Sequence, residues 1–172
     1  LAQIGCSDEA MRRFGARWPA AQVVQLAKNA QMSPLSTACG RYFQAAAALL
    51  GVCESESYEA EAAMRLESLV DQVDSVERDF SLLERPGQPT QLDLSSLWRR
   101  LLQCSPKDGA ALFHGTLAAG LVALALPMLR RLQLSDVMLG GGCVQNRVLC
   151  ESLRTSFARH GIAVRLPMRV PP

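Results

Sequence analysis

The segment from Val137 to Leu153, VMLGGGCVQNRVLCESL, constrains the possible folds of this chain more than any other. Asp136 to Leu139 is a short apolar run that predicts a strand, glycines follow it, and apolar residues at helical spacing then predict a helix. Ile162 to Leu166 predicts a second strand, so we expect a right-handed βαβ unit with parallel strands. The glycines at its first turn either leave backbone N–H groups open to a ligand or make a tight, closely packed turn.

Upstream of this unit, the apolar residues recur mostly at helical spacing. We expect helices from Ser7 to Arg13, Pro19 to about Gln31, just after Gly40 to Gly51, Tyr58 to Val73, Leu94 to Gln103 and Pro106 or Lys107 to Leu132, the last bent near Pro127. Arg85-Pro-Gly-Gln-Pro89 lies between two short apolar runs and predicts a β-hairpin. The fold class is therefore α/β and predominantly helical, with the helices forming one wall of a cleft that faces the glycine turn.

The charge balance, the cysteines and the apolar runs indicate which kinds of partner and which cellular compartment to expect. Eighteen basic and sixteen acidic residues nearly cancel, so we expect no nucleic-acid partner. The six cysteines include no CxxC pair, which predicts reduced thiols in a cytoplasmic protein rather than disulfides or a zinc site. Ala110 to Leu126 is apolar but shorter than the roughly 20 residues of a membrane span. We therefore predict a core helix there, with His114 as a satisfied core histidine, and no membrane partner.

A second candidate ligand site is the segment Ser36-Thr-Ala-Cys-Gly-Arg41, a loop of small residues that leads into a helix. Free N–H groups beside a guanidinium suit a ribose or phosphate oxygen. Arg41 could equally be a surface residue paired with a nearby carboxylate. Cys39, and Cys143 on the glycine turn, are by default small buried hydrophobes, although thiol pKa values can fall at helix starts.

Two more polar residues each allow two interpretations. Asn146 follows the glycines in the first helical turn, where its amide could contact a purine edge or cap the helix. Glu59, at the expected start of a helix, could bind ribose hydroxyls or simply stabilise the helix dipole. A Ser/His/Asp set for nucleophilic catalysis has no support in the sequence.

Three segments occur here in the order and spacing of one known family: SPLSTACGRYFQAAAALLG (33–51), SYEAEAAMRLESL (57–69) and the whole of 137–172. They resemble the C-terminal part of HypF, the carbamoyltransferase of nickel–iron hydrogenase maturation, which is similar to the tRNA-modifying enzyme TsaD. The resemblance implies that residues 1–172 are a single fragment, the second half of an actin-like ATPase (ribonuclease H-like) domain. The near-neutral charge and the sequence QNRVL after the glycines favour the hydrogenase-maturation enzyme over a TsaD-like tRNA-modifying enzyme.

The resemblance also implies a function and a site. The parent enzyme would consume carbamoyl phosphate and ATP, and would transfer the carbamoyl group from a carbamoyl-adenylate to the C-terminal cysteine of a HypE-like partner. No catalytic residue is expected in this chain. The residues that the resemblance places at the nucleotide are Cys39, Gly40, Arg41, Gln44, Glu59, Gly141, Gly142 and Asn146.

Three positions depart from the usual family pattern. Gln44 stands where the family has aspartate, Ala60 where it has glycine, and Gly140 where it has serine. The paired histidines that hold a metal in the family lie upstream, and an Asp-Gly step follows the final Val-Pro-Pro. We therefore expect a fragment that binds ATP or carbamoyl-adenylate weakly at most and is inactive alone. The alternative is a non-catalytic helical interaction module with a degenerate nucleotide pocket.

Overall fold

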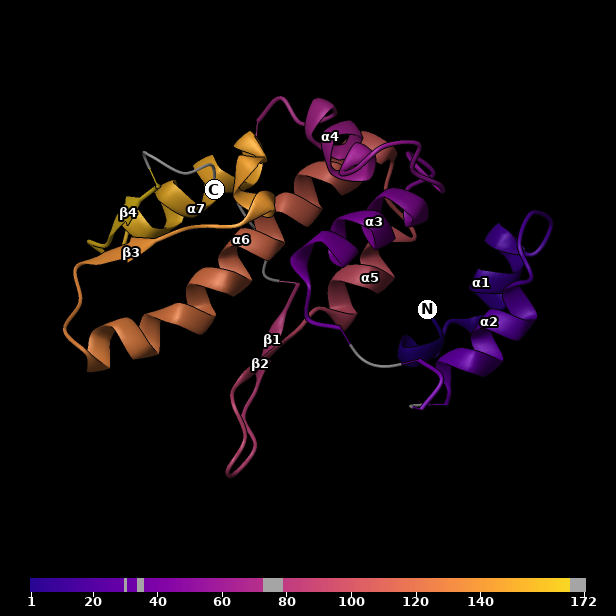
Figure 1. Cartoon of the computed structure of the whole chain (residues 1–172), viewed down its shortest axis with the longest axis horizontal. Helices are drawn as coiled ribbons and strands as arrows, with labels where there is room; N and C mark the ends of the chain where they lie inside the picture. The colour runs from indigo at the N-terminus through magenta and orange to yellow at the C-terminus, as the bar shows by residue number, and fades with distance from the viewer. Residues whose placement is uncertain (30, 34–35, 73–78, 168–172) are drawn as a thin grey trace. The chain divides into compact units, whose positions relative to one another are not determined.

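The computed structural model describes residues 1–29, 31–33, 36–72 and 79–167, and the chain divides into two compact units, Leu1–Ala38 and Cys39–Pro172. In the first unit, helix α1 (Ser7–Phe14) packs against helix α2 (Ala20–Ala27) (Figure 1), and the short 3-10 helix η1 (Ala2–Ile4) contacts α2.

Both boundaries of α2 differ from the predicted ones. Pro19 precedes α2 instead of beginning it, and α2 ends at Ala27 rather than near Gln31. The early end has a local cause, because the side-chain oxygen of Asn29 accepts hydrogen bonds from the N–H groups of Gln31 (3.0 Å) and Met32 (3.4 Å). Asparagine bonds of this kind compete with the helical hydrogen bonds.

Helix α6 (Pro106–Arg131) is the centre of the second unit. It begins where Ser105 accepts a hydrogen bond from the Asp108 N–H at 3.2 Å, with Pro106 in the first turn, where no amide partner is needed. Around it pack α3 (Cys39–Leu49), α5 (Ser95–Leu101) and α7 (Arg147–Ala158), and α4 (Glu61–Ser68) packs against α3. Figure 1 shows α6 crossing the whole unit between these helices.

By length and composition, α6 could also cross a membrane, since its most apolar window has a mean hydropathy of 1.8. However, 56% of that window is buried within the protein. On α6, the side chains of Phe113, His114 and Ala118 are fully buried. This burial is what a core helix requires, and it confirms the core helix predicted from Ala110 to Leu126.

Two small sheets complete the second unit. Strands β1 (Ser81–Leu83) and β2 (Gln91–Asp93) are antiparallel, which confirms the predicted hairpin. Strands β3 (Asp136–Met138) and β4 (Ala163–Arg165) are parallel, with α7 between them in sequence, which confirms the βαβ unit. The hairpin extends away from the helices in Figure 1, while β3 and β4 lie beside α7.

Two predicted helices of this unit are shorter in the structure. The helix expected from Tyr58 to Val73 is α4, which begins only at Glu61 because Ala60 adopts a left-handed conformation (φ 64°); Val73 lies outside the described residues. The helix expected directly after the glycines is preceded by a 3-10 helix, η2 (Gly142–Gln145), and α7 starts only after Asn146.

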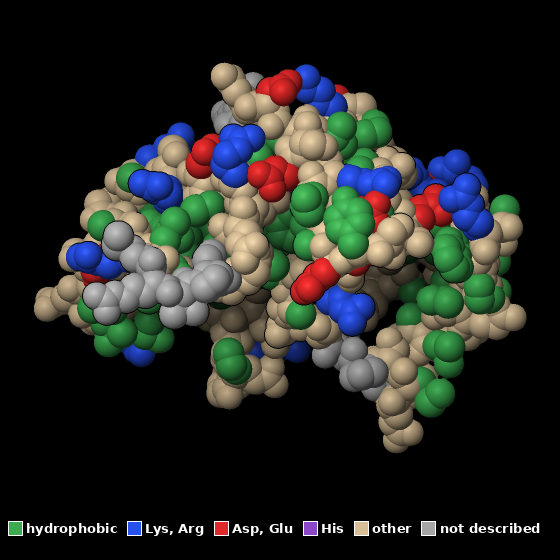
Figure 2. Space-filling view, turned by 45° about the horizontal axis from the view of Figure 1, so that its top comes forward, with side chains coloured by type: hydrophobic (Ala, Val, Ile, Leu, Met, Phe, Trp, Pro, Cys, Tyr) green, Lys and Arg blue, Asp and Glu red, His purple; other side chains and the backbone are tan. Residues whose placement is uncertain are grey.

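The surface carries mixed charge. On the face drawn in Figure 2, basic and acidic side chains lie next to one another instead of gathering by sign. The exposed ion pairs Asp71–Lys107 and Arg147–Glu151 are examples. Near-equal numbers of basic and acidic residues predict such a surface.

Candidate nucleotide site

The glycine turn after β3 is open, as one of the two sequence interpretations requires. Gly140, Gly141 and Gly142 are exposed, and a methyl group added to any of them would meet no atom within 4 Å. Gly141 has φ 94° and ψ 158°, a conformation that is essentially restricted to glycine. The backbone at the start of η2 is therefore accessible to a ligand.

Asn146 caps helix α7. Its side-chain oxygen accepts the Leu149 N–H at 2.9 Å, and its amide nitrogen donates to the carbonyl of Ala63 on α4 at 3.5 Å. The side chain is buried, with only 6% of the residue exposed. The structure thus confirms that Asn146 caps the helix, while a contact between its amide and adenine stays a prediction.

The start of α3 presents the second candidate turn. Gly40 and Arg41 are both exposed, and the space beside Gly40 is open. Among the residues that the structure describes, Arg41 has no hydrogen bond or ion pair, so the alternative of a surface pair with a carboxylate is not realised there. Gln44, one turn further along, donates from its amide to the Glu56 carboxylate.

Glu59 is exposed and lies outside α4, so the prediction that it opens that helix is wrong. The carboxylate at the helix start belongs to Glu61, which is only 3% exposed. Glu61 accepts the Ser57 N–H at 2.6 Å and forms an ion pair with Arg65. The sequence analysis did not single out Glu61, because it lies off the apolar stripe of the predicted helix.

Cys39 and Cys143 lie one on each of the two candidate turns. Cys39 is the first residue of α3 and Cys143 lies in η2, and these two elements are in contact. Both residues are half-buried against the core of the second unit. Burial, together with the neighbouring Cys143, raises the pKa of the Cys39 thiol to about 12.

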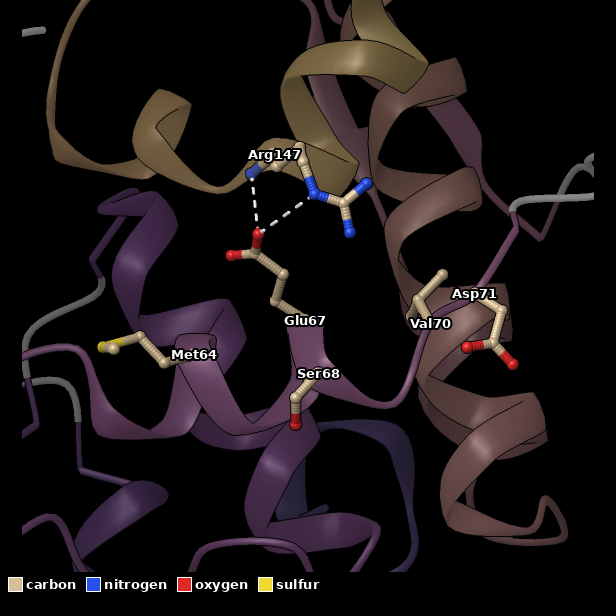
Figure 3. A pocket seen from close by; sticks show the side chains of 6 residues that line it. All are labelled: Met64, Glu67, Ser68, Val70, Asp71 and Arg147. Atoms are coloured by element: carbon tan, nitrogen blue, oxygen red, sulfur yellow. Dashed lines mark hydrogen bonds and ion pairs between the residues drawn. The ribbon is translucent and has the colours of Figure 1, made fainter.

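A pocket of about 540 Å³ lies between α4 and the start of α7 (Figure 3). Glu67 points across it and accepts the Arg147 N–H at 3.1 Å, while the guanidinium Nε of Arg147 lies 4.0 Å away. None of the eight predicted nucleotide residues lines this pocket, whose lining consists of Met64, Glu67, Ser68, Val70, Asp71 and Arg147. The sequence analysis did not find this junction, although Arg147 directly follows the predicted Asn146.

His114 is buried in the core, as predicted, but a hydrogen-bond partner is present for only one of its two ring nitrogens within the described part of the chain. Its Nδ1 lies 2.8 Å from the Ala110 carbonyl and must therefore carry the proton, while its Nε2 has no hydrogen-bond partner in the described part of the chain. Burial lowers the pKa of His114, although the Ala110 carbonyl and the nearby Asn146 amide partly oppose this fall. The imidazole is therefore neutral in the folded protein at neutral pH.

This neutral histidine predicts a pH-dependent stability. In the unfolded chain His114 takes up a proton as the pH falls below its ordinary pKa of 6.5, whereas the folded protein resists protonation. We therefore expect the free energy of unfolding to fall below about pH 6.5, by at most about 1.4 kcal/mol per pH unit. Urea unfolding of the wild type and His114→Gln at pH 7 and at about pH 5.5 measures this difference. Equal losses in both proteins would contradict the assignment.

Comparison with known proteins defines the class to which this geometry belongs. A family model described as carbamoyltransferase, Kae1-like domain, second subdomain, matches residues 2–172. This match extends over nearly the whole chain. Its class is therefore that of the Kae1-like domains of carbamoyltransferases.

Individual relatives specify the family. The chain is 31% identical over 198 residues to carbamoyltransferase HypF2 of Cupriavidus necator, which covers 100% of this chain and 24% of that protein. It is 38% identical over 160 residues to carbamoyltransferase HypF of Rhodobacter capsulatus, which covers 92% of this chain and 21% of that protein. The chain belongs to the HypF carbamoyltransferase family, which confirms the resemblance carried by the three segments. It spans less than a quarter of the length of these two relatives.

Solved structures share the fold. A full-length HypF in the phosphate- and nucleotide-bound form matches 99% of this chain with a TM-score of 0.83 and 22% identity, over 23% of that protein. HypF of T. kodakarensis matches 92% of this chain with a TM-score of 0.64 and 24% identity, over 21% of that protein. The predicted helical fold with small sheets is therefore confirmed at the level of a Kae1-like subdomain.

Proposed function

We propose that this chain is part of a carbamoyltransferase of hydrogenase maturation, in which it binds the nucleoside end of ATP or of a carbamoyl-adenylate. Family membership supports the transferase role. The finer assignment, half of an actin-like ATPase domain in a cytoplasmic protein, belongs to the same proposal. The carbamoyl group would pass to the C-terminal cysteine of a HypE-like acceptor, and the rest of the parent chain would supply the reacting groups.

The observation that carries the nucleotide proposal is the contact between the two glycine-containing turns. The start of α3 carries the exposed Gly40 and Arg41, and Arg41 has no hydrogen bond or ion pair with the described residues. Helix α3 contacts η2, which directly follows the open Gly140 and Gly141. Uncovered amides at a helix start together with a guanidinium suit phosphate or ribose oxygens. A relative with this fold has been solved in a phosphate- and nucleotide-bound form.

The described part of the chain offers no cluster of side chains that would hold a metal ion. The described residues contain no group of three or more histidine, cysteine, aspartate or glutamate side chains that could hold one. No step of the proposed role therefore uses a metal held by this chain. The metal-binding histidines expected from the resemblance would belong to the parent enzyme.

Replacement of Arg41 tests the nucleotide proposal. We expect Arg41→Ala to weaken the binding of AMP or an ATP analogue by about tenfold or more in isothermal titration, since a charge-assisted contact contributes about 1.5–3 kcal/mol. Its thermal unfolding should be nearly unchanged, because Arg41 is exposed and makes no hydrogen bond or ion pair with the described residues. Arg154→Ala, an exposed arginine two turns into α7, is the matched control and should bind as the wild type does.

Four outcomes would count against the proposal. Unchanged binding in Arg41→Ala, or no binding by the wild type at millimolar nucleotide, would favour the alternative of a helical interaction module. The hydrogen bond from the Gln44 amide to the Glu56 carboxylate is compatible with that alternative, since Gln44 is one of the residues predicted at the nucleotide. Submicromolar affinity or turnover by this chain alone would contradict the expected weak half-site.

A further inference from the structure

Glu56 links helices α3 and α4, which pack against each other (Figure 1). It is half-buried in the loop between them, and one oxygen of its carboxylate accepts a hydrogen bond from the Ala62 N–H at 3.0 Å, in the first turn of α4. The other oxygen accepts from the side-chain amide of Gln44 on α3. The loop is closed further by the bond from the Ser57 N–H to Glu61. The Glu56 carboxylate is therefore held between the two helices.

The carboxylate of Glu56 determines how the Gln44 amide is turned. An ionised carboxylate only accepts hydrogen bonds, so the NH₂ group of Gln44 must face Glu56 and its carbonyl oxygen must face away. Gln44 is exposed, and this oxygen has no hydrogen-bond partner among the described residues. Glu56 thus makes Gln44 a hydrogen-bond acceptor on the surface of α3.

Arg41 lies one turn before Gln44 on the same helix. Residues three positions apart lie on one face of a helix, so this face of α3 carries the donors of the Arg41 guanidinium and the acceptor oxygen of Gln44. A ligand that satisfies both has an anionic group for the guanidinium and a hydroxyl group that donates to the carbonyl. The phosphate and the ribose of a ribonucleotide supply these two groups.

We propose that Glu56 is a positioning residue, which orients Gln44 to accept a hydrogen bond from a ribose hydroxyl and so makes the candidate site prefer an intact ribose. This inference deepens the proposed function and rests on it. One hydrogen bond between neutral groups changes affinity by about two- to tenfold. The wild type should therefore bind AMP more tightly, by about this factor, than at least one of 2′-deoxy-AMP and 3′-deoxy-AMP.

Glu56→Gln tests the positioning role at nearly constant side-chain size. Glutamine has a single acceptor oxygen, and if that oxygen keeps the bond from Ala62, the NH₂ group of the new side chain faces Gln44. The Gln44 amide then turns, and its oxygen pairs with that NH₂ group instead of with a ligand. We expect the variant to bind AMP and both deoxy analogues equally in isothermal titration. The ratio of affinities is the measure, because loss of the Glu56 charge alters the binding of every anionic nucleotide alike.

Two further variants complete the titration. Gln44→Met removes the amide and should lose the same preference for AMP, and the double variant with Glu56→Gln should lose no more than either single one, because the two residues act through one contact. Glu84→Gln makes the same charge change at an exposed residue directly after β1 and should keep the wild-type preference.

The contact between Glu56 and Gln44 can be measured without any ligand. In a ¹⁵N-labelled protein, the side-chain amide signals of Gln44 are those that disappear in Gln44→Met. They should shift in Glu56→Gln and stay in place in Glu84→Gln. Unchanged Gln44 signals in Glu56→Gln would overturn the positioning role, whatever the titrations give.

The remaining outcomes separate this inference from the proposed function. If the Gln44 signals shift but the wild type binds none of the three nucleotides at millimolar concentration, the proposed function fails and the ribose role fails with it. If the wild type binds AMP without preference over either analogue, or if Glu56→Gln keeps the wild-type preference, the inference is wrong while nucleotide binding stands.

Discussion

Phe113→Ala is expected to lower the free energy of unfolding of the second unit by about 3–5 kcal/mol. Phe113 is fully buried on α6, and its ring meets the Phe43 ring edge-to-face with centroids 5.0 Å apart and the Trp98 ring at 6.3 Å. Truncation leaves a cavity where α3, α5 and α6 meet, and the aromatic contacts are lost together with the buried surface.

Trp98 allows this change to be measured directly. Urea unfolding followed by tryptophan fluorescence in a Trp18→Phe background reports on Trp98, and so on the second unit alone. Leu132→Ala is the control, because Leu132 directly follows α6 and is 55% exposed. Similar losses in Phe113→Ala and Leu132→Ala would show that the aromatic cluster is not the centre of this core.

Gly141→Ala should destabilise the protein by about 1–3 kcal/mol, the usual cost of a non-glycine residue in so restricted a backbone conformation. No neighbouring atom opposes the added methyl group, so the whole effect must come from the φ of 94°. If the turn relaxes to relieve this strain, the amides that it presents will move, and nucleotide affinity should fall together with stability.

Gly140→Ala provides the comparison. Gly140 is equally open but has no positive φ, so the same methyl group should change stability by less than about 0.5 kcal/mol. Urea unfolding and AMP titration of both variants measure the two effects. Equal effects of the two substitutions would mean that the backbone conformation of Gly141 is not what shapes the turn.

The sequence predicted the elements whose signals are local. The hairpin around Arg85–Pro89 and the βαβ unit followed from turn residues and periodicity, and α6 from Pro106 at its start and its long apolar run. Helix boundaries were less accurate where a side chain competes for backbone hydrogen bonds or where a residue adopts a left-handed conformation. Asn29 ends α2 early, and the left-handed Ala60 delays the start of α4.

The candidate site was predictable only in part, because the residues that contact one another there are far apart in the sequence. Periodicity identified both glycine-containing turns, but it could not show that Cys39 and Cys143 meet. It also could not show that Gln44 is held by Glu56, or that Glu61 rather than Glu59 is the buried carboxylate. Each of these contacts depends on how α3, α4 and η2 pack.

The hydrogen bonds from α4 to the beginning of α7 have an evolutionary consequence. Asn146 reaches the Ala63 carbonyl across 83 positions, and the Arg147 N–H reaches the Glu67 carboxylate across 80. Each of these bonds joins one side chain to a backbone group that any residue supplies. A chimera that exchanges either segment with a homologue should therefore keep both bonds wherever position 146 remains asparagine and position 67 remains glutamate.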